Sequence, residues 1–78
     1  MVAGEGKGVV RDEQRTAELY GRACDARLPT ACNNLGWLYE NGFGVEVDAE
    51  RAVDLYAGAC AAGVSAACEN RRRIAGKK

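Results

Sequence analysis

Small and apolar residues recur along this chain at the spacing of an α-helix. Five positions after Asp12 share one helical stripe, at i, i+3, i+4, i+7 and i+8: Thr16, Leu19, Tyr20, Ala23 and Cys24. No segment alternates between apolar and polar residues as a half-buried strand does. The pattern predicts an all-α chain in which this stripe is buried against a neighbouring helix.

Capping and turn residues indicate where the helices begin and end. The first helix begins after Asp12, whose carboxylate can accept from the free amide groups of a first turn, and it has Cys24 in its last turn. Pro29 cannot continue that helix but can open the next one. The second helix ends at "NGFG" (41–44), where Asn41-Gly42 and Gly44 are expected to supply the positive φ angles of a tight turn. A helix–turn–helix unit is therefore expected over the first half of the chain.

The second half repeats the first at an interval of 36 residues (60 − 24 = 68 − 32 = 36). Thirteen positions carry the same residue type 36 positions on: Gly6, Gly8, Val9, Asp12, Arg15, Leu19, Tyr20, Ala23, Cys24, Ala26, Ala31, Cys32 and Asn34. A third helix is thus expected after Asp48, with Gly63 as its left-handed C-terminal cap, followed by a fourth. Such periodicity predicts an α/α solenoid of two tandem helix–turn–helix repeats.

These repeats define the expected domain organisation. Residues 1–78 form a single domain, with repeat 1 at about 6–41 and repeat 2 at about 42–78. Where repeat 1 has Leu35-Gly36-Trp37, repeat 2 has three arginines, Arg71 to Arg73. A terminal helix needs a polar outer face, so the last helix is interpreted as a cap rather than as a basic tail for nucleic acid or lipid.

Apolar and aromatic positions of the second helix indicate the core. Ala31, Leu35 and Leu38 lie beside Cys32, Gly36 and Tyr39 on this helix. The aromatic residues are expected to pack in the core or between helices rather than to form a ligand cage. These residues are Tyr20, Trp37, Tyr39 and Tyr56.

Charge and composition exclude several classes of function. The chain has 11 Lys plus Arg and 11 Asp plus Glu, and this balance argues against nucleic acid or an anionic membrane as the main partner. Histidine is absent, which removes the Ser–His–Asp triad, the Cys–His pair and every zinc site that uses histidine. No cofactor or metal is expected, and the chain has no apolar run of the roughly 20 residues that would cross a bilayer.

One stretch resembles a known family of repeats. In "NNLGWLYENGFGVEVDAERAVDLYAGACAAG" four residue pairs and four single residues match the positions of a repeat signature. The pairs are Leu35-Gly36, Leu38-Tyr39, Gly44-Val45 and Leu55-Tyr56, and the single residues are Gly42, Asp48, Ala52 and Gly63. This arrangement is similar to the Sel-one-like repeats, relatives of the tetratricopeptide repeats, in their cysteine-rich bacterial branch. The resemblance covers residues 6–70 and implies a solenoid whose members mostly bind other proteins or act as adaptors.

The four cysteines fit a structural role best. Cys24 and Cys32 lie at adjoining ends of the first two helices, and Cys60 and Cys68 repeat that placement, within reach of a disulfide. The resemblance likewise implies one disulfide per repeat. Free buried thiols in a cytosolic chain remain an alternative. Metal or redox chemistry is less favoured, because zinc knuckles space their ligands two to four residues apart and no Cys-x-x-Cys occurs.

Two functions are consistent with this organisation. The favoured one is a non-catalytic module for a protein or peptide partner, which would dock on a concave face lined by the first helix of each repeat. The residues expected on that face are Arg15, Glu18, Arg22, Arg51 and Asp54. The alternative is a β-lactamase-like or peptidoglycan-acting hydrolase, as has been ascribed to relatives. Ser65 does not support it, because Cys68 stands where Ser-x-x-Lys has lysine.

The cysteines and the N-terminus point to different compartments. Paired cysteines are typical of an oxidising compartment, but "MVAGEGKGVV" has no apolar core and carries Glu5 and Lys7, unlike a signal peptide. We expect the chain to be the C-terminal part of a longer exported protein, or a short reading frame related to one. It would be periplasmic or secreted if a signal peptide lies upstream, and cytoplasmic otherwise.

Overall fold

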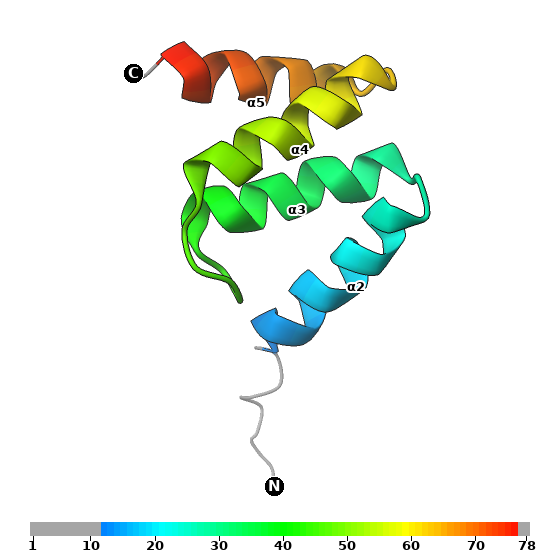
Figure 1. The fold of residues 1–78 in the computed structure, drawn as a ribbon, viewed down its shortest axis with the longest axis vertical. Helices are drawn as coiled ribbons and strands as arrows, with labels where there is room; N and C mark the ends of the chain where they lie inside the picture. The colour runs from blue at the N-terminus through cyan, green and yellow to red at the C-terminus, as the bar shows by residue number, and fades with distance from the viewer. Residues whose placement is uncertain (1–11, 77–78) are drawn as a thin grey trace, which may run out of the picture.

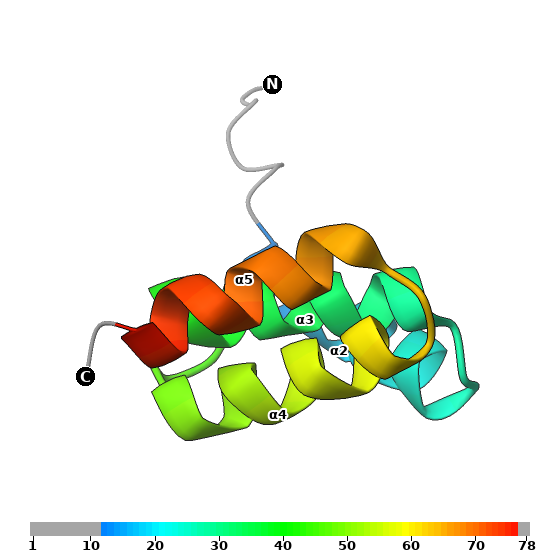
Figure 2. The same cartoon turned by 90° about the horizontal axis from the view of Figure 1, so that it is seen from above.

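The computed structural model describes residues 12–76, which form four α-helices and no strand. Each helix packs on the next along the chain, antiparallel to it (Figure 1). Seen from above, the first helices of the two pairs form one layer and the second helices the other (Figure 2). The predicted all-α solenoid of two helix pairs is confirmed. Its helices are α2 (Glu13–Asp25), α3 (Pro29–Asn41), α4 (Ala49–Ala61) and α5 (Ser65–Gly76).

The predicted helix starts are confirmed by their hydrogen bonds. An oxygen of the Asp12 carboxylate accepts from the backbone N–H of Arg15 at 3.2 Å. Asp48 accepts from the N–H of Arg51 at 3.1 Å in the same way. Each carboxylate satisfies an amide group that has no partner within the helix. Pro29 is the first residue of α3, a position where its missing N–H is not needed.

The turns between helices depend on residues with positive φ. Gly42 ends α3 at φ 77°, and Gly63 follows α4 at φ 106°, as their positions predicted. Arg27 occupies the position equivalent to Gly63 and also has positive φ, at 70°. A side chain in this region is sterically disfavoured, so the turn after α2 carries a local strain that the turn after α4 avoids.

Two clusters of small and aliphatic residues make up the core. One joins α4 to α5, and the other joins α2 to α3 and receives Leu55 from α4. Tyr39 packs against both clusters and so connects them. The fully or nearly buried members are Ala52, Tyr56, Ala59, Ala67 and Ile74 in the first cluster and Ala17, Leu35 and Leu38 in the second.

The burial predicted for the first helix is wrong at two positions. Thr16 is exposed and Leu19 is 54% exposed, whereas Ala17 is buried against α3. Leu55, at the position equivalent to Leu19, packs instead against residues of the preceding helix pair. Within residues 12–76 no preceding pair lies beside α2. Leu19 therefore occupies an inter-repeat position, whereas Tyr20 and Cys24 of the same stripe pack against the cluster that α2 forms with α3.

The packing predicted for Trp37 is also wrong. Its side chain is 47% exposed and lies on the surface of α3, with its ring centroid 5.0 Å from that of Phe43 in the following turn. The two rings are tilted by 47°. Trp37 thus covers the turn rather than joining two helices.

Candidate functional site: the concave face

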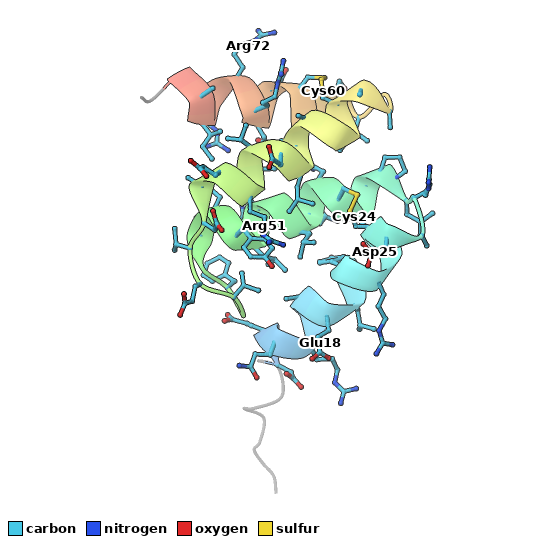
Figure 3. The ribbon with its side chains drawn as sticks, in the orientation of Figure 1. Glu18, Cys24, Asp25, Arg51, Cys60 and Arg72 are labelled. Carbon is cyan, nitrogen blue, oxygen red and sulfur yellow. A yellow bond between two sulfur atoms is a disulfide. The ribbon has the colours of Figure 1, made fainter. Side chains whose placement is uncertain are left out.

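Two disulfides fix the helix pairs beside their connecting turns. Cys24 is bonded to Cys32 and Cys60 to Cys68, with a Cα–Cα distance of 4.6 Å in both (Figure 3). One bridge per repeat is the predicted arrangement. Because all four cysteines are bonded, none offers a thiol as a nucleophile or a metal ligand.

A hollow of about 600 Å³ lies between α2, α3 and α4, and we call it the concave groove. Apolar side chains form its floor: Ala17, Leu35, Val45 and Leu55. The α3–α4 loop lies against the N-terminal turn of α2 and lines the same hollow through Gly44. A Cβ at Gly44 would come within 2.2 Å of the carbonyl oxygen of Glu13, so glycine permits this close approach.

Charged side chains line the groove above its apolar floor. Glu18 and Asp25 come from α2, and Arg51 comes from α4. The guanidinium carbon of Arg51 lies 5.2 Å from the centroid of the Tyr39 ring, within the range of a cation–π contact. Figure 3 shows Arg51 reaching from α4 across α3 towards α2. Among residues 12–76 no ion pair holds the side chain of any of these three charged residues.

A smaller hollow of about 390 Å³ continues past Arg51 along the start of α4. It shares Arg51 and Leu55 with the concave groove. Three acidic residues line it as well: Asp48, Glu50 and Asp54. The two hollows together are therefore lined by more acidic than basic residues.

The residues expected on the concave face divide into two groups in the structure. Glu18 and Arg51 line the groove together, and Asp54 lines the adjoining hollow. Arg15 is exposed and pairs with Asp12 at 3.5 Å, and the exposed Arg22 is among the lining residues of neither hollow. Sequence reasoning missed Asp25, although its spacing of seven residues from Glu18 places both on one helical face.

A polar network between α3, α4 and α5 was also missed. The carboxylate of Glu40 accepts from the Tyr56 hydroxyl at 2.7 Å and from Arg73 Nη2 at 3.0 Å. Burial and the hydrogen bond to Glu40 raise the pKa of Tyr56 well above its usual value. Glu40 has no acidic counterpart 36 residues on, where Gly76 stands, so the repeat gave no signal for this network.

A further hollow of about 650 Å³ lies beside this network. It is bordered by the C-terminal end of α3, the first half of α4 and the C-terminal end of α5. Val53 and Ile74 line its apolar part. Three acidic residues line it as well, Glu40, Glu50 and Asp54, of which Glu40 is already bonded to Tyr56 and Arg73. We call it the α4–α5 hollow.

Residues 12–76 contain no group of three or more histidine, cysteine, aspartate or glutamate residues placed to hold a metal ion. In the same range no helix combines the length and the apolar character needed to span a membrane.

The two-layer stack of antiparallel helix pairs defines an α/α repeat module. The family model of the Sel1 repeat matches residues 3–27 and 29–64, which is most of the chain. The chain therefore belongs to the Sel1 repeat family, whose members are helical repeat scaffolds that generally mediate protein interactions. No curated protein and no solved structure was found to match it.

Proposed function

We propose that this chain is a non-catalytic protein-interaction module that binds an extended peptide segment in its concave groove. The observation that carries the proposal is the groove itself, an apolar floor beside the charged groups of Glu18, Asp25 and Arg51, none of which is ion-paired within residues 12–76. An extended peptide offers both apolar side chains and hydrogen-bonding backbone, which such a surface can bind together. With two helix pairs the groove is short, so we expect affinity of about micromolar or weaker.

The proposal includes the division of the chain into repeat 1 (about 6–41) and repeat 2 (about 42–78, with α5 as a cap). The disulfide-linked pairs α2–α3 and α4–α5 support a boundary after residue 41. Arg72, at the position equivalent to Gly36, is exposed and directed away from the stack (Figure 3). A long side chain there would obstruct a helix packed as closely as α4 packs on α3, which supports a capping role for α5.

Lack of catalysis is part of the same proposal. No histidine occurs in the sequence, the four cysteines are bonded to each other, and Ser65 has Cys68 rather than lysine three residues on. These features remove the Ser–His–Asp triad, the Cys–His pair and the Ser-x-x-Lys nucleophile. Turnover of nitrocefin by the purified oxidised protein would favour the hydrolase alternative instead.

Two glycines provide a matched test of the groove. Gly21 lies within α2 and lines the groove, and Gly58 lies within α4 away from it; a Cβ at either would meet no atom within 4 Å. Both positions therefore have room for a Cβ atom without a clash in the fold. Peptides selected from a random library on the wild-type protein should lose about tenfold or more in affinity for Gly21→Leu, which places leucine in the groove.

The Gly58→Leu variant should retain the wild-type affinity, because its new side chain lies outside the groove. Circular dichroism of both variants checks that the fold is kept. Equal affinity of the peptides for both variants and the wild type would show that they bind elsewhere on the molecule. That result would overturn the groove as the docking site.

A further inference from the structure

The two acidic residues of the groove form one wall. Glu18 and Asp25 are seven residues apart on α2, which is about two helical turns and roughly 10 Å along the helix axis. Both line the groove, and no cation within residues 12–76 forms an ion pair with either. A carboxylate at the edge of an apolar floor is left to water unless a positive group from outside approaches it.

The position of Asp25 at the C-terminal end of α2 is unfavourable for a negatively charged side chain. Asp25 is the last residue of α2, where the negative end of the helix macrodipole disfavours a carboxylate. The equivalent residue of α4 is Ala61, so the fold does not require an acid at this position. Asp25 thus destabilises the end of α2. No ion pair within residues 12–76 offsets this effect.

Three arginines lie on or directly after α2 but line neither the groove nor its adjoining hollow: Arg15, Arg22 and Arg27. Arg51 is the one cation among the residues that line the groove and its adjoining hollow, and it lies on the α4 side, over Tyr39. Arg71 and Arg72 are exposed on α5, beyond α4. The groove consequently has a negative wall on α2, an apolar floor, and a single positive group on the opposite side.

We propose that the occupant of this groove is a protein segment that presents a lysine or arginine to the α2 wall of Glu18 and Asp25 and an apolar side chain to the floor. This inference rests on the proposed function and names the chemistry of its partner. The aliphatic stem of lysine or arginine can cover part of the apolar floor while its charged end reaches a carboxylate. Arg51 can donate to a backbone carbonyl of the same segment. The acidic wall repels the phosphates of a nucleic acid, so a peptide is the matching ligand.

The test uses three short peptides, capped at both ends, in which one leucine is flanked by lysines, by glutamines or by glutamates. Each is titrated into the oxidised full chain while backbone amide shifts are followed by NMR. The lysine peptide should bind best, should shift amides around Glu18, Asp25 and Leu55, and should weaken as salt is added. Glu18→Gln and Asp25→Asn should each weaken the lysine peptide about two- to fivefold, the range of an exposed ion pair.

Glu69→Gln is the matched control, because Glu69 is an exposed acid on α5 that lines neither the groove nor its adjoining hollow. It should leave the affinity for the lysine peptide unchanged. If the three peptides bind the groove equally, or if the glutamate peptide binds best, the inference is wrong while the proposed function stands. If none of them shifts a groove amide but library-selected peptides do, the inference alone fails. If no peptide of either kind shifts those amides, both fail.

Discussion

The ring of Tyr56 lies directly against Gly36, in space that a single methyl group at residue 36 would occupy. A Cβ on Gly36 would lie 2.9 Å from Cε1 of Tyr56 and 3.3 Å from the carbonyl oxygen of Ala52. Tyr56 is fully buried and its hydroxyl is hydrogen-bonded to Glu40, so the ring has little freedom to move aside. This contact sets how closely α4 approaches α3, the helices that contribute Leu55 and Leu35 to the groove floor.

Substitution of Gly36 tests that contact. Gly36→Ala should lower the free energy of unfolding by about 1–3 kcal/mol, because the added methyl group overpacks the interface. Gly58→Ala is the matched control within α4, where nothing lies within 4 Å, and it should raise stability by about 0.5–1 kcal/mol. Urea unfolding of the oxidised proteins, followed by circular dichroism, measures both. A neutral Gly36→Ala would show that the interface tolerates a wider helix spacing.

Removal of one disulfide should destabilise the second helix pair. The Cys60–Cys68 bridge closes a short loop, for which the chain-entropy model gives about 2.5 kcal/mol. The double variant Cys60→Ala, Cys68→Ala should lose about that amount in oxidising buffer and much less in reducing buffer. Equal losses in both buffers would instead mean that the sulfur atoms act through packing.

The equivalent turns after α2 and α4 predict opposite effects of two substitutions. Arg27 and Gly63 both have positive φ, and their backbone N–H groups bond to the carbonyls of Cys24 and Cys60, at 2.9 Å and 3.0 Å. Arg27→Gly should raise the free energy of unfolding by about 0.5–1 kcal/mol, and Gly63→Ala should lower it by about 1 kcal/mol. Thermal unfolding measures the two effects. A destabilising Arg27→Gly would indicate that the arginine side chain makes a contact worth more than the strain.

The raised pKa of Tyr56 predicts a loss of stability at alkaline pH. The folded-state pKa lies above the unfolded value of about 10, so the unfolded chain releases this proton first as pH rises. Stability from this group is complete below pH 10 and is lost progressively above it. The thermal midpoint should therefore fall above that pH, and the fall should be smaller in Tyr56→Phe. An identical alkaline fall in both proteins would assign it to other groups.

Local features of the fold could be predicted because they depend on residues close in sequence. Asp12 and Asp48 cap their helices through the amide three residues on, and Gly42 and Gly63 adopt the positive φ that their turns need. The disulfide pairs follow from a short turn in the same way. Because the sequence repeats after 36 residues, the second pair of helices could be predicted from the first pair.

Features that depend on neighbouring repeats could not be predicted from the pattern alone. Leu19 and Leu55 are the same residue in the same register, yet only Leu55 has a preceding helix pair within residues 12–76 to pack on. The Glu40–Arg73 pair breaks the repeat, so comparison of the two halves gives no sign of it. Asp25 breaks it too, with Ala61 as its counterpart. The candidate site was thus predicted as a face, while part of its chemistry required the structure.

The most direct test of the central claim is to locate a bound peptide by intermolecular nuclear Overhauser effects. A library-selected peptide bound to the oxidised protein should show contacts to the methyl groups of Leu35 and Leu55 and to the ring of Tyr39, all of which line the concave groove. Contacts to Val53 and Ile74 in their place would put the peptide in the α4–α5 hollow and contradict the account.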